Sequence, residues 1–396
     1  MDSEFELSKS YKPNKADWLD GTWTGFKTAS FDARRGKTSS NEEDIKLIAK
    51  EIHFIPENFT PHKRIKKIYN DRYQSIVNEK NIDWATDEAL AFASLLADGY
   101  GVRLSGQDVG RGTFSHRHAV LYDQENEERF VPLRHFRKKQ GLFEIVDSFL
   151  SEFGVLGFEY GYSQADPKTL VIWEAQFGDF SNGAQTIIDQ FITTGERKWL
   201  RMSGLTLLLP HGHEGQGPEH TSSRLERFLQ MCAEDNIQVA NPTSPANYFH
   251  ILRRQMLRDF RKPLILMTPK STLRHKNNTS SLDQFVNGST FHRVLSDRIS
   301  KDLKNKIDRI ILCSGKIYFE LQDRINELNL KIIHIVRVEQ LYPFPYEALE
   351  EELQEFKNCE IFWCQEEPKN MGAWQFIEQR IHRVLLKIGI EKKLHF

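Results

Sequence analysis

From residue 83 onward, strand-like apolar runs alternate with amphipathic stretches of helical length. The segment DWATDEALAFASLLADG has a helix N-cap residue at Asp83, an apolar stripe and a stop at Gly99, so it predicts a helix. The run TLVIWEAQF at 169–177 is almost continuously apolar, which is typical of a strand covered on both faces. This alternation indicates α/β units built on a mainly parallel sheet.

The same alternation of predicted strands and helices continues to residue 269. Strands are predicted where short apolar runs end in turn residues, and helices where apolar positions recur every three to four residues. The predicted strands are VRLSG (102–106), HAVLYD (118–123), TLLLP (206–210), IQVANP (237–242) and PLILMTP (263–269), and the predicted helices cover 148–163, 183–195, 222–235 and 244–260.

A polar stretch, KSTLRHKNNTSS at 270–281, interrupts this order, and a second, smaller α/β unit follows it. We therefore predict an α/β fold with two open, mainly parallel sheets flanked by helices. The predicted domains are an N-terminal arm over 1–75, a first α/β domain over 76–287 and a second over 288–396. In the second unit, the predicted strands are 309–315, 331–338 and 360–367, and the predicted helices are 316–328, 346–356 and 374–388.

The composition narrows the class of protein. At about 100–200 residues per domain, the 396 residues allow two or three domains. The formal net charge of −1 gives no reason to expect nucleic acid or an anionic membrane as a partner, and the basic cluster at 62–67 is better explained as a solvated helix face. The apolar runs are too short to span a bilayer, and the acidic N-terminus resembles neither a signal peptide nor an Arg-rich transit peptide.

Cysteine usage points away from metal and disulfide chemistry. No two cysteines form a CxxC pair, so neither a zinc site nor thioredoxin-like redox chemistry is expected. Scattered thiols in apolar or helical segments suit a reducing compartment. The four cysteines are Cys232, Cys313, Cys359 and Cys364.

The stretch LSGQDVGRGTFSHRH at 104–118 is the first candidate for chemistry. It follows one predicted strand and precedes another, and ligands bind at the carboxyl ends of strands in open α/β sheets. His116 and His118 can move protons near neutral pH or donate hydrogen bonds to a developing anion. His118 is the stronger candidate, because it directly precedes the predicted strand. The alternative is a polar surface loop.

Two further stretches carry candidate residues, each with a structural alternative. Glu152 stands at the start of an otherwise apolar helix, either as a helix N-terminal charge or as a functional carboxylate. The segment at 208–226 contains His211, His213 and His220 between acids and glycines. Its spacing matches no usual zinc pattern, so a rigid loop at an active site or dimer contact is favoured over a metal site.

Taken together, these stretches resemble the thiamine-dependent decarboxylating component of 2-oxoglutarate dehydrogenase. The likeness runs from about residue 62 to residue 374. It covers the family's pyrimidine-binding and C-terminal domains, whereas the N-terminal diphosphate-binding portion has no counterpart here. It is carried by LSGQDVGRGTFSHRH, DSFLSEFGVLGFEYGYS, LVIWEAQFGDFSNGAQTIIDQFI, LPHGHEGQGPEHTSSRLERFLQ, LYPFP and EEPKNMGAW.

The resemblance assigns roles residue by residue. Glu152 matches the glutamate that hydrogen-bonds the aminopyrimidine ring of thiamine diphosphate and promotes loss of the thiazolium proton. Phe180 matches the aromatic residue that stacks on that ring. His116 and His118 match the histidine loop near the substrate. Ser105 and Asp108 complete the predicted cofactor-binding set.

The magnesium site of the family is not expected in this chain. The family's motif begins with GDG and ends with paired asparagines about two dozen residues later. Here Gly178 and Asp179 are followed by Phe180, and the pair at 277–278 lies much too far away. We therefore predict no metal ligands in this chain, and magnesium ligands on the diphosphate-binding portion.

The resemblance implies an oxidoreductase of the tricarboxylic acid cycle that decarboxylates 2-oxoglutarate and transfers the succinyl group to a lipoyl arm. Its expected partners are the dihydrolipoyl succinyltransferase and dihydrolipoyl dehydrogenase of the complex, and a second copy or a separate diphosphate-binding chain. The expected compartment is the bacterial cytoplasm or the mitochondrial matrix. The chain alone is expected to be inactive. The alternatives are a non-catalytic binding or regulatory module, a subunit of the pyruvate or branched-chain type, or a piece of a longer protein.

Overall fold

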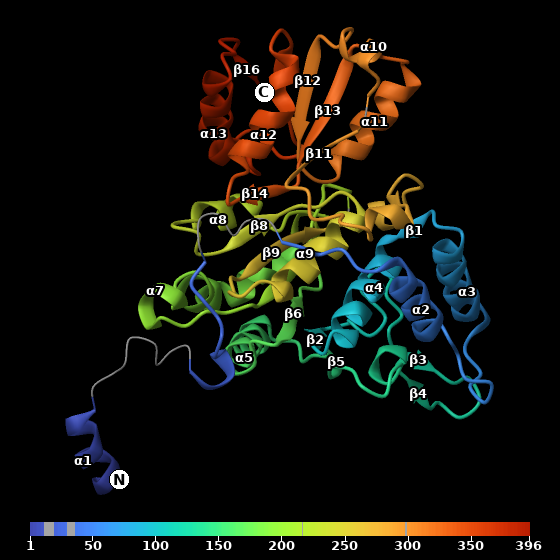
Figure 1. Ribbon diagram of the computed structural model, residues 1–396, viewed down its shortest axis with the longest axis vertical. Coiled ribbons are helices and arrows are strands. Elements are labelled where there is room, and N and C mark those ends of the chain that lie inside the picture. Colours follow the sequence, from blue (N-terminus) through green and yellow to red (C-terminus); the bar gives the residue numbers. More distant parts are fainter. Residues whose placement is uncertain (12–19, 30–35, 216, 298) are drawn as a thin grey trace.

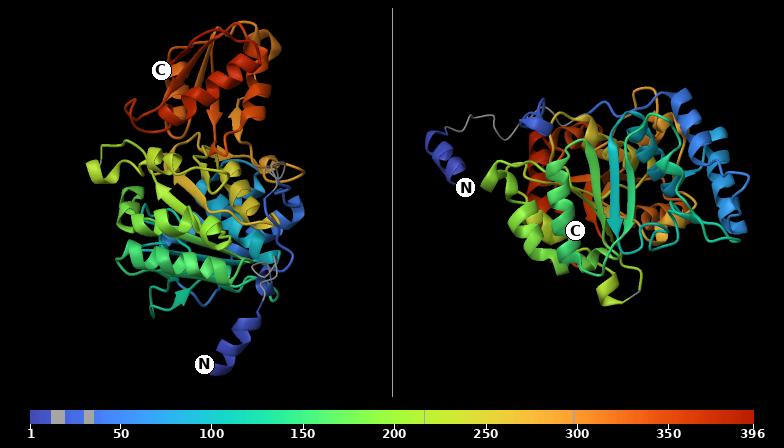
Figure 2. Two further views of the ribbon diagram at one scale, coloured as in Figure 1. Left: turned by 90° about the vertical axis from the view of Figure 1, so that its left-hand side faces the viewer. Right: turned by 90° about the horizontal axis from the view of Figure 1, so that it is seen from below.

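The computed structural model describes residues 1–11, 20–29, 36–215, 217–297 and 299–396, so parts of the predicted arm lie outside the described residues. Two α/β units follow one another along the chain, and Figure 1 shows the second unit, in orange and red, stacked above the first. The side view in Figure 2 shows the same stacking. The predicted class, mainly parallel sheets flanked by helices, is confirmed.

The first unit is built on a seven-stranded sheet in the order β14-β8-β9-β7-β6-β2-β5. All neighbours are parallel except β14, which runs antiparallel to β8 and comes from the C-terminal part of the chain. The strands are β2 (Gly101–Gly106), β5 (Phe143–Asp147), β6 (Thr169–Glu174), β7 (Thr206–Pro210), β8 (Gln238–Ala240), β9 (Leu264–Thr268) and β14 (Gln340–Tyr342).

Apolar side chains cover both faces of this sheet. In β6 all six residues are buried, with Leu170 and Ile172 in one core and Val171 and Trp173 in the other. One face packs on α2 (Glu42–Ile52), α3 (Lys63–Val77), α4 (Trp84–Ala97) and α9 (Pro245–Leu257), and the other on α5 (Glu152–Ala165), η4 (Gly178–Ala184), α6 (Gln185–Ile187), η5 (Ile188–Ile192) and α8 (Leu225–Gln230). The short helix α7 (Gly195–Trp199) follows η5.

The second unit holds a five-stranded sheet in the order β11-β13-β12-β15-β16. Only the edge strand β11 is antiparallel to its neighbour. The core on the α5 side of the first sheet continues into this unit. The strands are β11 (Val294–Ser296), β12 (Arg309–Cys313), β13 (Ile333–Val338), β15 (Glu360–Cys364) and β16 (Leu394–His395), and the helices are α10 (Lys301–Lys304), α11 (Ile317–Glu327), α12 (Tyr346–Leu353) and α13 (Trp374–Lys387).

Smaller elements connect these units. Two antiparallel pairs lie outside the main sheets, and the helix near the N-terminus buries no residue. Within the described residues, no helix has both the length and the apolar character needed to cross a bilayer. The remaining elements are α1 (Asp2–Ser10), η2 (Gly21–Trp23), β1 (Ile82–Asp83) with β10 (Thr279–Ser280), β3 (Leu121–Tyr122) with β4 (Arg129–Phe130), η3 (Pro132–Arg134), η6 (Pro218–His220), η7 (Ser271–Arg274), η8 (Leu282–Gln284) and η9 (Gln354–Phe356).

Three predicted elements are wrong in extent. The strand predicted over 118–123 is reduced to β3, which pairs with β4 and does not join the main sheet. The helix predicted over 183–195 is a series of short helical segments of different pitch. The helix predicted over 222–235 is reduced to α8, because Arg224 adopts a left-handed conformation just before it. The boundary between 287 and 288 stays a prediction.

Candidate active site

The loop after β2 lies at the carboxyl end of that strand, where parallel α/β sheets bind their ligands. Glycine is required at Gly106, since a Cβ there would lie 2.4 Å from the backbone oxygen of Glu174. The chain then turns back through residues 107–118 before it reaches β3. The loop therefore begins where the ends of β2 and β6 are in contact.

Arg117 anchors this loop to the sheet. Its guanidinium is buried and donates two hydrogen bonds to Glu174, of 2.7 and 2.8 Å, at the end of β6. It also donates to Glu88 of α4, which in turn accepts a 2.9 Å hydrogen bond from the Tyr248 hydroxyl. Two bidentate carboxylates satisfy a buried guanidinium well. The arginine between the two histidines thus has a structural role.

His116 has an enclosed ring with an unsatisfied nitrogen. Its Nδ1 atom is buried and has no hydrogen-bond partner among the described residues. A Cβ on Gly112 would lie 2.6 Å from the ring, so the glycine makes room for it. Burial, together with the charges of Arg117 and Arg72, lowers the pKa of His116 well below its usual range. The ring is therefore neutral at pH 7.

His118 does not have the position expected from the sequence. It lies in a left-handed turn with φ of 51°, and β3 begins only at Leu121, so the argument that a strand fixes its backbone is wrong. The His118 backbone is instead held by the Tyr69 hydroxyl of α3, which donates to its oxygen at 2.7 Å, and by hydrogen bonds within the loop, such as that from the Ala119 amide to the Gly110 oxygen. The His118 Nε2 atom lies 3.0 Å from the Ser115 oxygen. Burial and the charge of Arg72 lower the pKa of His118.

Glu152 is the first residue of α5, where the loop after β2 and the short helix η4 meet. Ser151 caps the helix by accepting a 3.2 Å hydrogen bond from the Gly154 amide. The Glu152 Oε1 atom accepts a 3.0 Å hydrogen bond from the Gln107 side chain. A Cβ on Gly183 of η4 would lie 3.2 Å from Glu152 Oε2. Three segments thus converge on this carboxylate.

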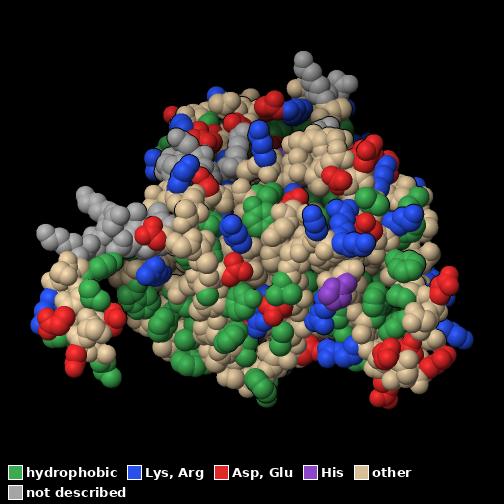
Figure 3. All heavy atoms as spheres, turned by 60° about the horizontal axis from the view of Figure 1, so that its bottom comes forward, with side chains coloured by type: hydrophobic (Ala, Val, Ile, Leu, Met, Phe, Trp, Pro, Cys, Tyr) green, Lys and Arg blue, Asp and Glu red, His purple; other side chains and the backbone are tan. Residues whose placement is uncertain are grey.

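The surface beside Glu152 is apolar and open. Phe149 is 89% exposed, Leu150 84% and Phe153 52%. In Figure 3, hydrophobic side chains gather over the part of the molecule where α5 and α7 lie. Large apolar side chains in such a group are unusual on the free surface of a soluble protein and mark contact sites.

Phe180 lies in η4 within a group of aromatic rings. The His220 ring packs edge-to-face on Phe180 and on Phe177, with centroids 5.5 and 4.5 Å apart. Phe114 of the histidine loop packs edge-to-face on Phe177 at 5.4 Å. Three loops that are far apart in sequence therefore meet around Phe177.

Hydrogen bonds hold the segment before Ser223 against η4. Asp179 accepts hydrogen bonds from the amides of Thr221 and Ser222, of 3.3 and 3.1 Å. The Lys270 ammonium group donates to the backbone oxygens of Gly212 and His220, at 2.9 and 2.7 Å. These contacts hold Gly212 and residues 220–222 in place. Across the described part of the chain, no three His, Cys, Asp or Glu side chains group in a way that could hold a metal ion.

The two remaining predicted residues differ in their surroundings. Ser105 is buried in β2, and its hydroxyl has no partner within the described structure. Asp108 forms an ion pair with Arg111 of the same loop, so its carboxylate is already engaged. The structure brings Glu152 and η4, which carries Phe180, into contact. His118 and Asp108 have other partners.

One site residue and one site contact were missed by reasoning from the sequence. Gln107 contacts the Glu152 carboxylate, and the only signal for it was its position directly after a predicted strand. His220 contacts Phe180, whereas the sequence placed His220 in a loop at an active site or dimer contact without indicating this partner. The contact joins residues 40 positions apart, so no local pattern reveals it.

Comparison with known proteins defines the class first. The model of the transketolase pyrimidine-binding domain matches residues 80–276, and the model of the 2-oxoglutarate dehydrogenase C-terminal domain matches residues 279–396. The chain thus carries a pyrimidine-binding domain of the thiamine enzymes followed by that C-terminal domain. It belongs to the family of 2-oxoglutarate dehydrogenase E1 components, as the sequence motifs predicted.

Several relatives are bacterial proteins of that name. The 2-oxoglutarate dehydrogenase E1 component of Brucella anthropi is 56% identical over 400 residues, which is 98% of this chain and 40% of the relative. Those of Brucella abortus and Brucella canis have the same identity and the same coverage. The chain therefore spans about 40% of the length of these relatives.

Proposed function

We propose that this chain is the part of a 2-oxoglutarate dehydrogenase E1 component that binds the pyrimidine half of thiamine diphosphate. Its role is the decarboxylation of 2-oxoglutarate and the succinylation of the lipoyl group of an acyltransferase. The observation that carries this proposal is the convergence of Glu152 and η4, which bears Phe180, beside an open apolar surface.

The residues present fit the pyrimidine ring. A carboxylate at Glu152 can bond a ring nitrogen and hold or release its proton, and Phe180 offers an aromatic face. The unpaired Ser105 hydroxyl is a further group that a polar ring substituent would satisfy. When bound, thiamine diphosphate supplies the nucleophilic carbon and the electron sink that decarboxylation of a 2-oxo acid requires.

The histidines would act on the substrate side. The neutral His116 ring has an Nδ1 atom free to accept or donate a hydrogen bond, and His220 lies against Phe180. Either ring can bond a carboxylate or a developing oxyanion of the substrate. His118 stays a candidate for the same role. Asp108 is a weaker candidate for the cofactor, because it would have to leave Arg111.

The remainder of the machinery lies on other protein segments. We infer that the diphosphate group and its magnesium ion bind to the portion that the relatives carry in addition, in the same subunit or a second copy. The exposed apolar side chains near Glu152 support such a contact. The inferred partners in the complex are dihydrolipoyl succinyltransferase and dihydrolipoyl dehydrogenase, in the bacterial cytoplasm or the mitochondrial matrix.

Two other functions would give a different result when Glu152 is replaced or when other 2-oxo acids are offered. A non-catalytic module would keep the fold but not depend on Glu152 for any chemistry. A pyruvate or branched-chain subunit would show the same dependence on Glu152 but a preference for another 2-oxo acid. The family matches name 2-oxoglutarate dehydrogenase and lend no support to that subunit type.

The test is Glu152→Gln in the assembled enzyme that includes the diphosphate-binding portion. Glutamine keeps the volume and an acceptor but cannot take up a proton. We expect proton exchange at the thiazolium carbon to slow by at least about 100-fold, the usual scale of an acid–base contribution, with an unchanged melting temperature. Proton exchange by NMR and calorimetry measure the two quantities.

Glu42→Gln is the matched control. Glu42 is also the first residue of a helix, and the substitution removes the same charge from the same kind of position. If the two variants lose the same amount of stability and neither slows proton exchange, Glu152 is a helix-end charge. The proposed function would then fail.

A further inference from the structure

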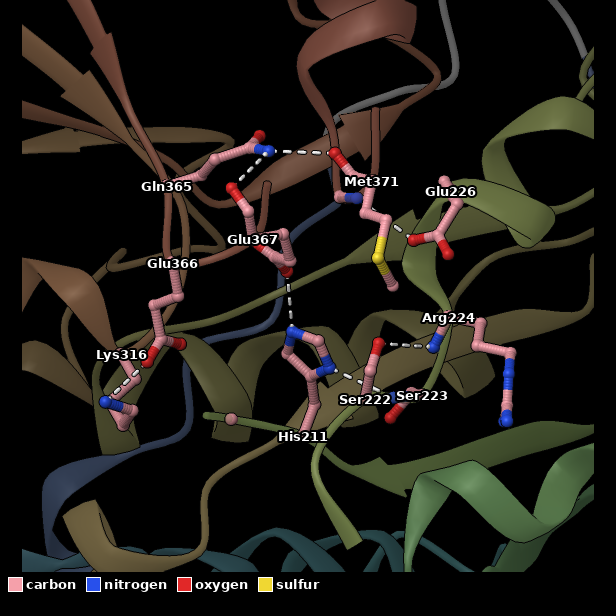
Figure 4. Close-up of polar contacts among 12 residues, drawn as sticks. His211, Ser222, Ser223, Arg224, Glu226, Lys316, Gln365, Glu366, Glu367 and Met371 are labelled. Atoms are coloured by element: carbon pink, nitrogen blue, oxygen red, sulfur yellow. Dashed lines mark hydrogen bonds and ion pairs between the residues drawn. The ribbon is translucent and has the colours of Figure 1, made fainter. Parts of the chain in front are cut away.

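The two units meet through a buried histidine and a buried glutamate (Figure 4). His211 follows β7 in the first unit, and Glu367 follows β15 in the second. The His211 Nε2 atom lies 2.9 Å from Glu367 Oε1, and the Ser223 amide donates to His211 Nδ1 at 3.1 Å. Because an amide can only donate, Nδ1 is the acceptor, and Nε2 carries the hydrogen that bonds Glu367.

The segment that ends at Ser223 also contacts Asp179, the residue before the candidate stacking residue Phe180. The two residues before Ser223 donate their amides to the Asp179 carboxylate, and the Arg224 guanidinium donates to the Asp179 backbone oxygen at 3.0 Å. Asp179 directly precedes Phe180. The backbone that carries Phe180 is therefore held by the segment that His211 orients.

Close packing leaves this segment little freedom. A Cβ on Gly178 would lie 1.9 Å from the Ser223 hydroxyl oxygen, so the backbone of Gly178 packs directly on the Ser223 side chain. Packed interiors transmit small displacements because they contain few voids. A shift of Ser223 would thus move the start of η4, where Phe180 lies.

Another contact across the same interface does not continue to Phe180. Glu226 of α8 accepts a 3.0 Å hydrogen bond from the Gly372 amide of the second unit, whereas Lys316 and Glu366, also drawn in Figure 4, form an ion pair within the second unit. The Glu226 contact holds the units together, but within the described residues no side-chain hydrogen bond leads from Glu226 to Asp179. Glu226 therefore offers a comparison in which the interface is weakened and the path to Phe180 is left intact.

We propose that Glu367 and His211 are positioning residues through which the second unit sets Phe180 against the pyrimidine ring of the cofactor. Glu367 fixes the His211 ring, the ring fixes Ser223, and the segment before Ser223 fixes Asp179. The proposal rests on the proposed function, because it concerns the same cofactor. Neither residue is expected to contact the cofactor or the substrate.

The first experiment compares Glu367→Ala with Glu226→Ala in the assembled enzyme. Each removes one carboxylate acceptor from the same interface. For Glu367→Ala we expect proton exchange at the thiazolium carbon and kcat to fall by up to about 100-fold, the cost of a displaced reacting group. KM for 2-oxoglutarate should change by less than about twofold, because no substrate contact is lost. Glu226→Ala should leave all three quantities within about twofold.

Two further variants separate positioning from folding. Glu367→Gln keeps an acceptor for the His211 Nε2–H group, so it should restore most of the rate. His211→Asn keeps an acceptor for the Ser223 amide but loses the link to Glu367, so it should be as slow as Glu367→Ala. The two defects should not add in the double variant, because both break one link. Urea unfolding of this chain checks that each variant folds.

The outcomes distinguish the two proposals. The positioning role is overturned if Glu367→Ala and Glu226→Ala behave alike, if Glu367→Gln is as slow as Glu367→Ala, or if the double variant shows additive losses. In each case a slow Glu152→Gln variant leaves the proposed function standing. If Glu152→Gln exchanges the cofactor proton at the wild-type rate, the proposed function fails as well.

Discussion

At the scale of single residues, the side chains of the loop after β2 divide between structure and chemistry. Arg117 is satisfied by two buried carboxylates, so it holds the loop. His116 keeps a buried nitrogen that no described residue satisfies, and such a group in a native protein calls for an external partner. The surroundings of His118 are more ordinary, since its ring bonds a nearby backbone oxygen.

This difference makes His116 the stronger candidate, whereas the sequence favoured His118. We predict that His116→Ala in the assembled enzyme lowers turnover of 2-oxoglutarate by about 10²–10³, the range for loss of one preorganised donor. The dissociation constant of thiamine diphosphate should stay nearly unchanged. His118→Ala is the paired variant, with a smaller expected effect. Steady-state kinetics and calorimetry measure both. If only His118→Ala is slow, His118 is the residue that acts on the substrate, as the sequence suggested. If neither variant is slow, the loop has no chemical role.

Arg117 leads to a prediction about stability. Arg117→Met removes the partner of two buried carboxylates and should lower the free energy of unfolding by about 3–5 kcal/mol, as for other broken buried ion pairs. Arg111→Ala is the control, because its ion pair with Asp108 is exposed and contributes at most about 1 kcal/mol. Urea unfolding of this chain measures both. Similar losses in the two variants would contradict the structural role of Arg117.

At the scale of elements, the connection between the two units is more buried than its polar sequence suggests. The polar composition of 270–281 suggests an exposed linker, but Lys270, Asn278 and Ser280 are buried. The stretch at 303–308, by contrast, contains mostly exposed or half-buried residues at the end of a four-residue helix. Proteases cleave where the backbone opens easily.

We therefore predict that, beyond residue 83, limited digestion with trypsin cuts first within 303–308. Lys304 and Lys306 supply the cleavage sites. Mass spectrometry of the first fragments identifies the position. Earlier cleavage after Lys270 or Arg274 would mean that the polar stretch opens more readily than its burial indicates. Earlier cleavage within 150–260 would count against two separable units.

The elements that sequence reasoning found are those with a strong local signal. The helix after Asp83 begins and ends as predicted, because its cap and its apolar stripe agree. The strand β14 has only three residues, and its partner β8 lies 100 positions earlier, so no local pattern marks it. The helix expected over 222–235 ends at Gln230, and the left-handed conformations of Glu234 and Asp235 exclude its continuation to residue 235.

At the scale of the whole molecule, the site is assembled by topology. Glu152 and Phe180 could be named from motifs, but their approach depends on parallel strands that end at the same edge of one sheet. The contacts of His220 with Phe180, and of Glu367 with His211, join loops from distant parts of the chain. Sequence patterns report local periodicity, so they left these contacts unseen.

The set of cofactor-binding groups in the whole molecule also limits which part of the cofactor this chain can bind alone. Its candidate site offers groups for the pyrimidine ring, but the sequence has no GDG motif with a correctly spaced asparagine pair for the diphosphate. The diphosphate carries most of the charge of the cofactor, and its electrostatic attraction to a metal ion is a large part of such binding. The surface beside Glu152 is meanwhile exposed to water, which weakens the hydrogen bonds that the carboxylate can offer.

We therefore predict that this chain alone binds thiamine diphosphate weakly or not at all, with or without magnesium. Addition of the diphosphate-binding portion should restore binding, because it supplies the ligands of the metal ion and covers the apolar surface. Isothermal titration calorimetry of the chain alone, and of the chain with that portion, measures the difference. In the completed protein, Phe149→Ser combined with Leu150→Ser should weaken binding without any contact to the diphosphate, since it removes apolar area from the expected contact. Micromolar binding by the chain alone would mean that the pyrimidine-binding unit carries a complete cofactor site.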